Sequence, residues 1–590
     1  MKTLNGGELS GRHTPSGAAA FRWKHRVLVL AVAGAGMFAS GTYSIAAVHK
    51  ADNNQDLGSG GSWVEGLPGG TDVALWDNTV SAGNAAGAPL TTSLVVGEVQ
   101  VANPGGPVVI SGPGTLTING INGVGIDTTG NTQNLTINSG VVLGGSQNWN
   151  IGVGTTTTVT GVVGGTGDLT KDGDGTLVLT NANTYAGNTF MNRGTMTLNF
   201  GAAGAPASNI LIPGSLTLAS GTFNVVGGAG NVQTFNSLKN QVGLTNFNVD
   251  TGTVTIGTLT SFTGNNFARG STIRFNTTNG GSILLTNGGS SGAILQAGSG
   301  SAIGFATFGL YDWAAISDDG LRQIVGGSQL QSGNFYKATG AGAVGAGTAT
   351  DFGFSNLDVT GVGSVRTAAA QYTVQSVRFN TPTGGQNTYN GNTADQLIIN
   401  IKGGSNLSNF LRTGSYLVTP NVGANDIIIT STAGNPLTGE QGIETSRDSS
   451  LIGNVVFWQN NTSGLLIINT GITDSKAGGA GVTKAGAGSM VINATNNGNP
   501  GNFAINEGTV QITSNANLGN QNSNIVYLNG GGGLIVNANM ALDSSGGTGT
   551  NARAVNVSGL GNLTATTGSS LIVSGALTGA GTLTVGTPDA

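Results

Sequence analysis

The stretch GTGDLTKDGDGTLVLTNANTYAGNTFMNRGTMTLN, residues 165–199, decides how the rest of the chain is interpreted. It consists of short runs in which Leu, Val, Phe or Met alternates with Thr, separated by Gly, Asn and Asp. Such alternation places apolar side chains on one face of a β-strand and polar ones on the other. Glycine and asparagine accept the positive φ that a sharp corner requires. The stretch therefore predicts several short strands joined by tight corners.

Strands of this kind recur along the chain every 18–24 residues. Their central apolar residues are Leu116, Leu135, Val159, Leu177, Met196 and Leu216. We expect an all-β chain that folds as a right-handed parallel β-helix, a solenoid with short loop excursions whose coils stack into one rod. Asn at matching corners of successive coils is expected to form ladders of hydrogen-bonded amides. A β-sandwich or an array of hairpins is the alternative.

The composition agrees with many strands and turns and excludes several classes of function. Of 590 residues, 105 are Gly, 8% are charged and none is Cys, whereas ordinary domains carry about 25% charged residues. Without Cys there are no disulfides and no thiol chemistry. After residue 50, 15 basic residues face 25 acidic ones. We expect no nucleic-acid partner, because nucleic-acid binding needs clustered Lys and Arg.

The N-terminus has the pattern of a Sec-type signal peptide. Three basic residues, Arg22, Lys24 and Arg26, precede an apolar run that begins at Val27. A basic segment followed by a short apolar one is typical of a cleaved leader. We therefore expect a signal peptide with a long basic segment at 1–47, cleaved near Ala46 or Ala47, and a β-helix over 48–590. An uncleaved membrane anchor over 27–48 is the alternative.

Residues 165–199 resemble the passenger-associated transport repeat, also called the autotransporter-associated β-strand repeat. The family pattern is Leu-Thr-Lys, Gly-x-Gly-Thr-Leu, Asn-x-Tyr-x-Gly-x-Thr and Asn-x-Gly-Thr-Leu. Its counterparts here are Leu169 to Lys171, Gly173 to Leu177, Asn183 to Thr189 and Asn192 to Met196. A second copy at 481–512 keeps Lys484, Gly486, Gly488, Asn506 and Gly508. A partial third copy begins at 574–590, with Val585 where the pattern has Lys.

The resemblance implies an autotransporter passenger, secreted or held at the cell surface, with a structural or adhesive role. Its expected partners are glycans or the surfaces of host or neighbouring cells. Such passengers are followed by an outer-membrane translocator barrel. The strands after Ile512 keep the short coil pattern. We therefore expect no C-terminal β-barrel within this chain, and a translocator barrel outside it as a further partner.

The chain is poor in the residue types, His and Cys, that many catalytic sites require. The three histidines are His13, His25 and His49, so only His49 follows the leader. A Ser-His-Asp triad needs an imidazole within the folded body, and zinc sites need His or Cys. The GGSSG motif at 288–292 is explained by the abundance of Gly. We expect no enzyme, no cofactor, no metal and no catalytic residue.

Paired carboxylates are the remaining route to catalysis. Asp172 and Asp174 occupy a corner where the second copy has alanines, so we expect them to be solvated. Asp318 and Asp319 lie in a segment with little coil pattern, near Trp313 and Arg322. They define the alternative function, a β-helix polysaccharide lyase or glycoside hydrolase using Asp318/Asp319. We interpret this segment, 306–326, as a loop excursion instead.

Overall fold

The computed structural model describes residues 46–261, 270–287, 304–333, 335–339, 343–344, 356–359, 364–367, 372–381, 387–389, 392–399, 410–412, 415–431, 442–444, 455–473, 481–494, 501–519, 524–543 and 552–586. Across these residues the regular structure is almost entirely β. The helices in this part of the chain are short: α1 (Ala82–Gly87), η1 (Gly60–Ser62), η3 (Gly327–Gln329), η4 (Pro420–Val422) and η5 (Asn515–Leu518). None of the described helices is long and apolar enough to cross a membrane.

The strands of the N-terminal half form three sheets, which together make up stack 1. Sheet 1 runs β1 (Ala47–His49), β2 (Val73–Asp77), β4 (Glu98–Ala102), β7 (Val124–Asp127), β10 (Gln147–Asn150), β13 (Leu169–Asp172), β15 (Thr189–Met191), β17 (Ser215–Leu218), β19 (Val232–Asn240), β21 (Thr253–Ser261) and β23 (Ser282–Asn287). Sheet 2 runs β5 (Val108–Ile110), β8 (Leu135–Ile137), β11 (Thr156–Val159), β14 (Thr176–Leu179), β16 (Thr195–Asn199), β18 (Gly221–Val226), β20 (Leu244–Val249), β22 (Thr272–Thr277), β24 (Ala306–Phe308), β25 (Asp312–Ile316) and β26 (Ile324–Gly326). Sheet 3 runs β3 (Leu94–Val96), β6 (Thr115–Ile118), β9 (Gly140–Leu143) and β12 (Val163–Gly165).

The strands of the C-terminal half form stack 2. Sheet 4 runs β27 (Tyr336–Thr339), β29 (Asn356–Val359), β32 (Ser376–Phe379), β36 (Ser415–Val418), β39 (Val455–Gln459), β42 (Val482–Ala485), β44 (Phe503–Ile505), β46 (Val526–Asn529), β49 (Val555–Ser558) and β52 (Leu577–Thr578). Sheet 5 runs β28 (Ala343–Val344), β30 (Ser364–Thr367), β34 (Asn392–Ile399), β37 (Asp426–Ser431), β40 (Leu466–Ile468), β43 (Ser489–Ile492), β45 (Thr509–Ile512), β47 (Gly532–Val536), β50 (Leu560–Ala565) and β53 (Thr582–Gly586), with β33 (Asn387–Tyr389) beside β34. Sheet 6 runs β31 (Tyr372–Thr373), β35 (Phe410–Arg412), β38 (Gly442–Glu444) and β41 (Gly471–Thr473), and sheet 7 pairs β48 (Met540–Ala541) with β51 (Leu571–Ile572).

Successive coils pair in parallel, each strand lying on the corresponding strand of the preceding coil. Thus β11 pairs with β14 and β14 with β16, with Leu177 opposite Met196. The predicted parallel β-helix is confirmed, and the sandwich and hairpin alternatives are wrong. Leu177 and Met196 are fully buried, as the alternation requires. In the next two coils, Phe223 lies opposite Met196 and Phe247 opposite Phe223. The rings of Phe223 and Phe247 stack, with centroids 5.2 Å apart.

Ladders of Asn amides join neighbouring coils, as the sequence suggested. Asn493 Nδ2 donates to Asn469 Oδ1 over 2.8 Å where β40 and β43 end, which confirms the corner ladder. A longer ladder lies in mid-strand on sheet 2, where Asn248 donates to Asn224 over 2.8 Å and Asn276 to Asn248 over 2.7 Å. Asn is thus used on the outer strand face as well as at corners.

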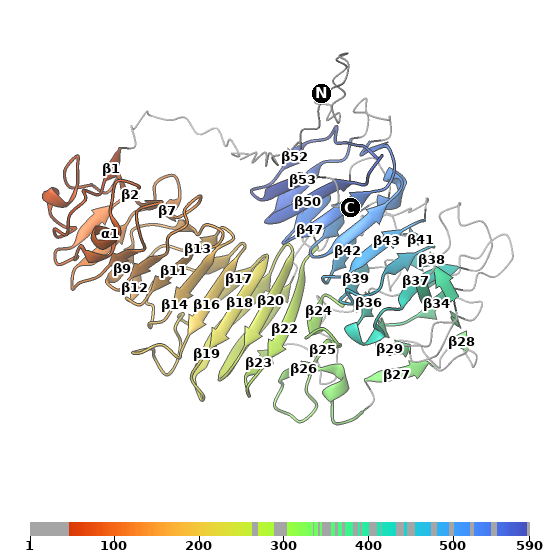
Figure 1. Cartoon of the computed structure of the whole chain (residues 1–590). Helices are drawn as coiled ribbons and strands as arrows, with labels where there is room; N and C mark the ends of the chain where they lie inside the picture. Colours follow the sequence, from red (N-terminus) through yellow and green to blue (C-terminus); the bar gives the residue numbers. More distant parts are fainter. Residues whose placement is uncertain are drawn as a thin grey trace, which may run out of the picture.

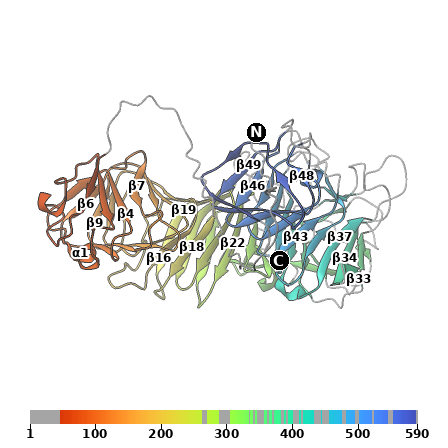
Figure 2. The same ribbon diagram turned by 45° about the horizontal axis from the view of Figure 1, so that its top comes forward.

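The coils do not form one rod, and this part of the prediction is wrong. The parallel order of sheet 2 ends where β24, β25 and β26 pair antiparallel. Stack 2 then begins with its own sheets and its own apolar core. Figures 1 and 2 show the two stacks side by side, in contact near β22 to β24 and β39 to β42 and diverging toward β1 and β53. An antiparallel hairpin covers the edge that a further coil would otherwise use.

Outward-facing side chains hold the two stacks together. In β39 every residue from Val455 to Gln459 is buried, whereas strands facing water alternate. Trp313 of stack 1 and Trp458 of stack 2 belong to one buried apolar cluster between the stacks. Arg274 of stack 1 lies over the Trp458 ring at 5.6 Å and bonds Glu507 Oε2 at 3.1 Å. Because Trp313, Trp458 and Arg274 are buried, the contact is a packed interface.

We expect the double substitution Arg274→Ala with Trp458→Ala to separate the stacks. The change removes the ion pair and one of the two tryptophan side chains of the contact, a loss of several kcal/mol. Each stack keeps its own core, so the far-ultraviolet circular dichroism should stay unchanged while the radius of gyration in small-angle scattering increases. Arg193→Ala is the control, because Arg193 pairs with Asp172 within stack 1. An unchanged radius in the double variant would contradict the interface.

Candidate functional site

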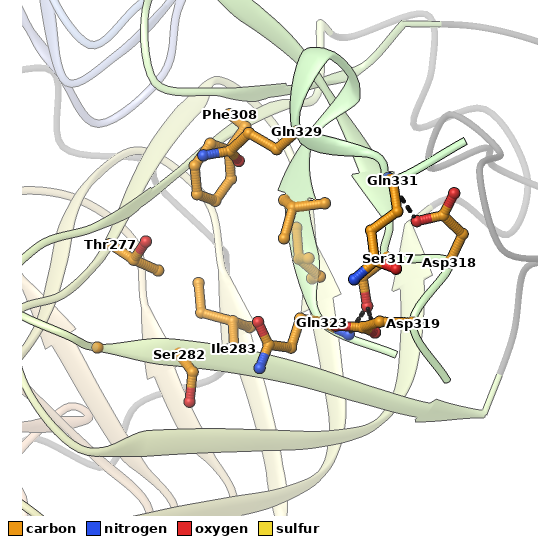
Figure 3. A pocket seen from close by; sticks show the side chains of 13 residues that line it. Thr277, Ser282, Ile283, Phe308, Ser317, Asp318, Asp319, Gln323, Gln329 and Gln331 are labelled. Carbon is orange, nitrogen blue, oxygen red and sulfur yellow. Dashed lines mark hydrogen bonds between the residues drawn. The ribbon is translucent and has the colours of Figure 1, made fainter. Parts of the chain in front are cut away.

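A polar hollow lies where the last coil of stack 1 meets the β25–β26 hairpin. Its volume is about 290 Å³. Thr277, Gly281, Ser282 and Ile283 line it from the coil, and Phe308 comes from β24. The hairpin and the segment after it contribute the remaining lining residues, which are Ser317, Asp318, Asp319, Gln323, Ile324, Val325, Gln329 and Gln331. Figure 3 shows Gln329 beside Phe308 at one end and Gln323 at the other. The hollow contains both carboxylates of the alternative function.

Both carboxylate oxygens of Asp318 accept hydrogen bonds from the backbone of the segment after η3. Its Oδ2 accepts the Ser332 N–H and its Oδ1 the Gln331 N–H, each over 2.8 Å. These bonds lower the pKa of Asp318, because they favour the ionised form. Both oxygens are therefore used to hold the segment after η3 in place.

Asp319 is held in the same way one residue later. Its Oδ1 accepts the Ser317 hydroxyl at 2.6 Å and the Leu321 N–H at 2.9 Å. These bonds lower the pKa of Asp319, the Ser317 bond having the largest effect. Glycosidases need one carboxyl with a raised pKa that can donate a proton. Two ionised carboxylates supply no such acid, so this geometry does not favour hydrolysis at Asp318 and Asp319.

The aromatic and the arginine that lie near these carboxylates in the sequence have their side chains elsewhere in the fold. Trp313 is fully buried between the stacks and does not line the hollow. Arg322 directs its Nε to the Leu285 carbonyl oxygen at 2.9 Å, across to β23. The sequence places both residues near Asp318, but strand alternation and the hairpin turn direct their side chains away.

Three other features from the sequence remain to be located: the GGSSG motif, the predicted leader and His49. The GGSSG motif and residues 1–45 of the predicted leader lie outside the described residues. His49 Nδ1 lies 2.9 Å from Glu65 Oε1 in an exposed pair. In the part of the chain that the structure describes, no group of three or more His, Cys, Asp or Glu side chains could hold a metal ion.

Each transport-type repeat encloses a buried lysine. Lys171 lies fully buried in β13, and its Nζ donates to the carbonyl oxygens of Asp172 (3.1 Å), Arg193 (3.0 Å) and Gly173. Gly194 lies against this ammonium group, since a Cβ there would be 2.5 Å from Lys171 Nζ. We call this arrangement the lysine cage. The cage joins one coil to the next, because Arg193 lies just after β15, in the coil that stacks on β13.

The second repeat builds the same cage in stack 2. Lys484 is fully buried, and its Nζ donates to the carbonyl oxygens of Glu507 (2.7 Å), Gly488 (2.5 Å) and Gly486. A Cβ at Gly508 would lie 2.5 Å from Lys484 Nζ. Burial lowers the pKa of both lysines from 10.5 to about 7, and nearby carboxylates partly oppose the shift. The repeat signature thus encodes a structural device that closes a coil.

Asp172 and Asp174 are not the solvated corner that the sequence suggested. Asp172 Oδ1 lies 2.5 Å from Arg193 Nε, and Asp174 Oδ2 lies 3.5 Å from Arg193 Nη1. The arginine comes from the next coil, so the carboxylates help to join coils. Alternation along β13 could have revealed the lysine cage, because Lys171 has the same parity as the inward Leu169. We made no prediction from that signal.

The protein is a parallel β-solenoid in which each stack contains a coil closed around a buried lysine, Lys171 or Lys484. The family model of the passenger-associated transport repeat matches residues 169–198 and 482–512, the two segments that carry the cages. These two segments are passenger-associated transport repeats, as the sequence suggested. The partial copy at 574–590 stays a prediction.

Among curated proteins, the chain is similar to the adhesin BmaC autotransporter of Brucella suis biovar 1 (strain 1330). The two are 31% identical over 161 residues, which is 27% of this chain and 4% of that protein. The chain therefore spans a small part of the length of the curated relative that it matches. No solved structure matches the chain.

Proposed function

We propose that the chain is the adhesive passenger of an autotransporter-like protein, presented at the bacterial cell surface. The observation that carries the proposal is the pair of transport repeats, each closed around a buried lysine. The similarity to an adhesin autotransporter supports the adhesive role. The coils also present long rows of Thr and Asn on their outer faces, a polar surface suited to contact with other surfaces.

The proposal includes export and partners. Residues 1–47 direct Sec export, residues 48–590 form the passenger, and an outer-membrane translocator anchors it. Its targets are glycans or the surfaces of host or neighbouring cells. The transport repeats assist secretion, because a coil that closes around its own lysine is a stable unit on which the next coil folds.

The test is a count of adherent cells. The full chain is joined to an outer-membrane translocator in a non-adherent laboratory strain, and surface exposure is verified by protease treatment of intact cells. We expect at least about a tenfold gain in adherence to glycan-coated surfaces or cultured cells over a strain that displays the translocator alone. Normal display with no gain in adherence on either surface would overturn the adhesive role.

A further inference from the structure

We infer that the hollow between the last coil of stack 1 and the β25–β26 hairpin binds a single neutral sugar residue. The inference rests on the proposed adhesive function and assigns one contact site to it. The lining residues meet only in the folded chain, because those from Thr277 to Ile283 belong to the last coil, Phe308 to β24, and those from Ser317 to Gln331 to the hairpin segment. The last coil of stack 1 and the hairpin thus build the site together.

The lining offers free amides for hydrogen bonds. The side chains of Gln323 and Gln331 make no hydrogen bond to any residue in the part of the chain described here. Gln329 uses Oε1 to accept the Gly326 N–H at 2.7 Å, which fixes its amide at the rim. A primary amide offers donor and acceptor side by side, which suits the hydroxyl groups of a sugar. Ile283, Ile324 and Phe308 supply an apolar base for the C–H face of a ring.

The charges exclude other classes of ligand. Among the described residues that line the hollow there are two ionised carboxylates and no Lys or Arg, so an anion would be repelled. Both Asp318 oxygens and one of Asp319 already accept protein donors, which leaves too few ligands for a metal ion. A neutral polyhydroxylated molecule satisfies the amides and can donate to the remaining Asp319 oxygen.

The size of the hollow limits the ligand to one ring. Its volume of about 290 Å³ lies just below the range for ligand pockets, about 300–1,000 Å³. A single pyranose bound through a few amide contacts is held weakly, with a dissociation constant on the order of 1 mM. An adhesin gains overall strength by repeating weak contacts over many copies on one cell.

The experiment titrates the full chain with methyl pyranosides of glucose, galactose, mannose and fucose, by saturation-transfer NMR. We expect at least one to bind in the millimolar range, and N-acetylneuraminic acid, which is anionic, not to bind. Gln323→Ala with Gln331→Ala should weaken binding at least about tenfold, since each lost hydrogen bond contributes several-fold. Gln100→Ala, on the outer face of β4, is the matched control and should bind normally.

Three results would overturn the inference: no binding of any neutral pyranoside, preferred binding of the anionic sugar or of Ca²⁺, or undiminished binding by the double variant. Cell adherence separates this inference from the proposed function. If displayed cells adhere but no pyranoside binds, the site is wrong and the adhesive function stands. If a pyranoside binds and displayed cells do not adhere, the site stands and the adhesive function fails.

Discussion

Gly194→Ala is expected to cost about 4 kcal/mol of local stability in the first transport repeat. The glycine has φ +73°, and its Cβ position is 2.5 Å from Lys171 Nζ. The left-handed conformation costs about 1–2 kcal/mol for an alanine. Displacing a well-packed neighbour adds about 1–3 kcal/mol. The added methyl group would also clash with the Gly173 carbonyl oxygen, a backbone atom of the same cage, so the substitution opens the coil.

Hydrogen exchange of peptides covering residues 169–198 measures the effect, because it reports the free energy of local opening. Gly154→Ala is the matched control. Gly154 has φ +76°, similar to Gly194, but no atom of the described residues lies within 4 Å of its Cβ position. It should cost only the conformational term, about 1–2 kcal/mol. Equal losses in the two variants would show that the clash with the cage is unimportant.

Lys171→Met is expected to cost about 3 kcal/mol in the same coil. Methionine fills a similar volume but leaves three carbonyl oxygens, one buried and two partly buried, without their shared donor. Each unsatisfied buried polar group costs about 1–3 kcal/mol. The variant no longer buries a charge, and this gain offsets part of the combined cost of the three carbonyl oxygens. Lys239→Met is the control, because Lys239 lies on the half-exposed face of β19. A loss no larger than that of Lys239→Met would contradict a stabilising cage.

The cost of Lys171→Met should also depend on pH. The lysine has a pKa of about 7 in the folded chain against 10.5 for a free side chain. Between these values the unfolded chain binds a proton that the folded chain does not, so folded stability rises with pH across the window. The variant lacks this contribution. The difference in unfolding free energy between wild type and variant should therefore be larger at pH 9 than at pH 6.

The coil pattern could be predicted because it is local. Alternation alone places Leu177 and Met196 inward, and both are fully buried. The stacking of coils follows, because each short strand needs a neighbour of the same pattern. The family signature likewise located both repeats before the structure showed what Lys171 and Lys484 do.

The division into two stacks could not be predicted from that pattern. It depends on outward-facing residues such as Trp458, which in a strand-by-strand analysis look like exposed apolar side chains. These residues are buried only because stack 1 packs against them in the folded chain. The partners in this contact lie far apart in sequence, as Arg274 and Glu507 do. The hollow was missed for a related reason. Sequence proximity grouped Trp313 and Arg322 with Asp318, whereas the hairpin brings Gln323 and Gln331 there.

Amine labelling tests whether each transport repeat closes around its own buried lysine, Lys171 in the first repeat and Lys484 in the second. The full chain is treated with an acylating reagent at pH 8, and modified lysines are located by mass spectrometry. We predict rapid modification of the accessible Lys239 and Lys337, and modification of Lys171 and Lys484 at least about 100-fold slower until urea unfolds the chain. Labelling of Lys171 and Lys484 at the rate of Lys239 in the folded chain would contradict the cages.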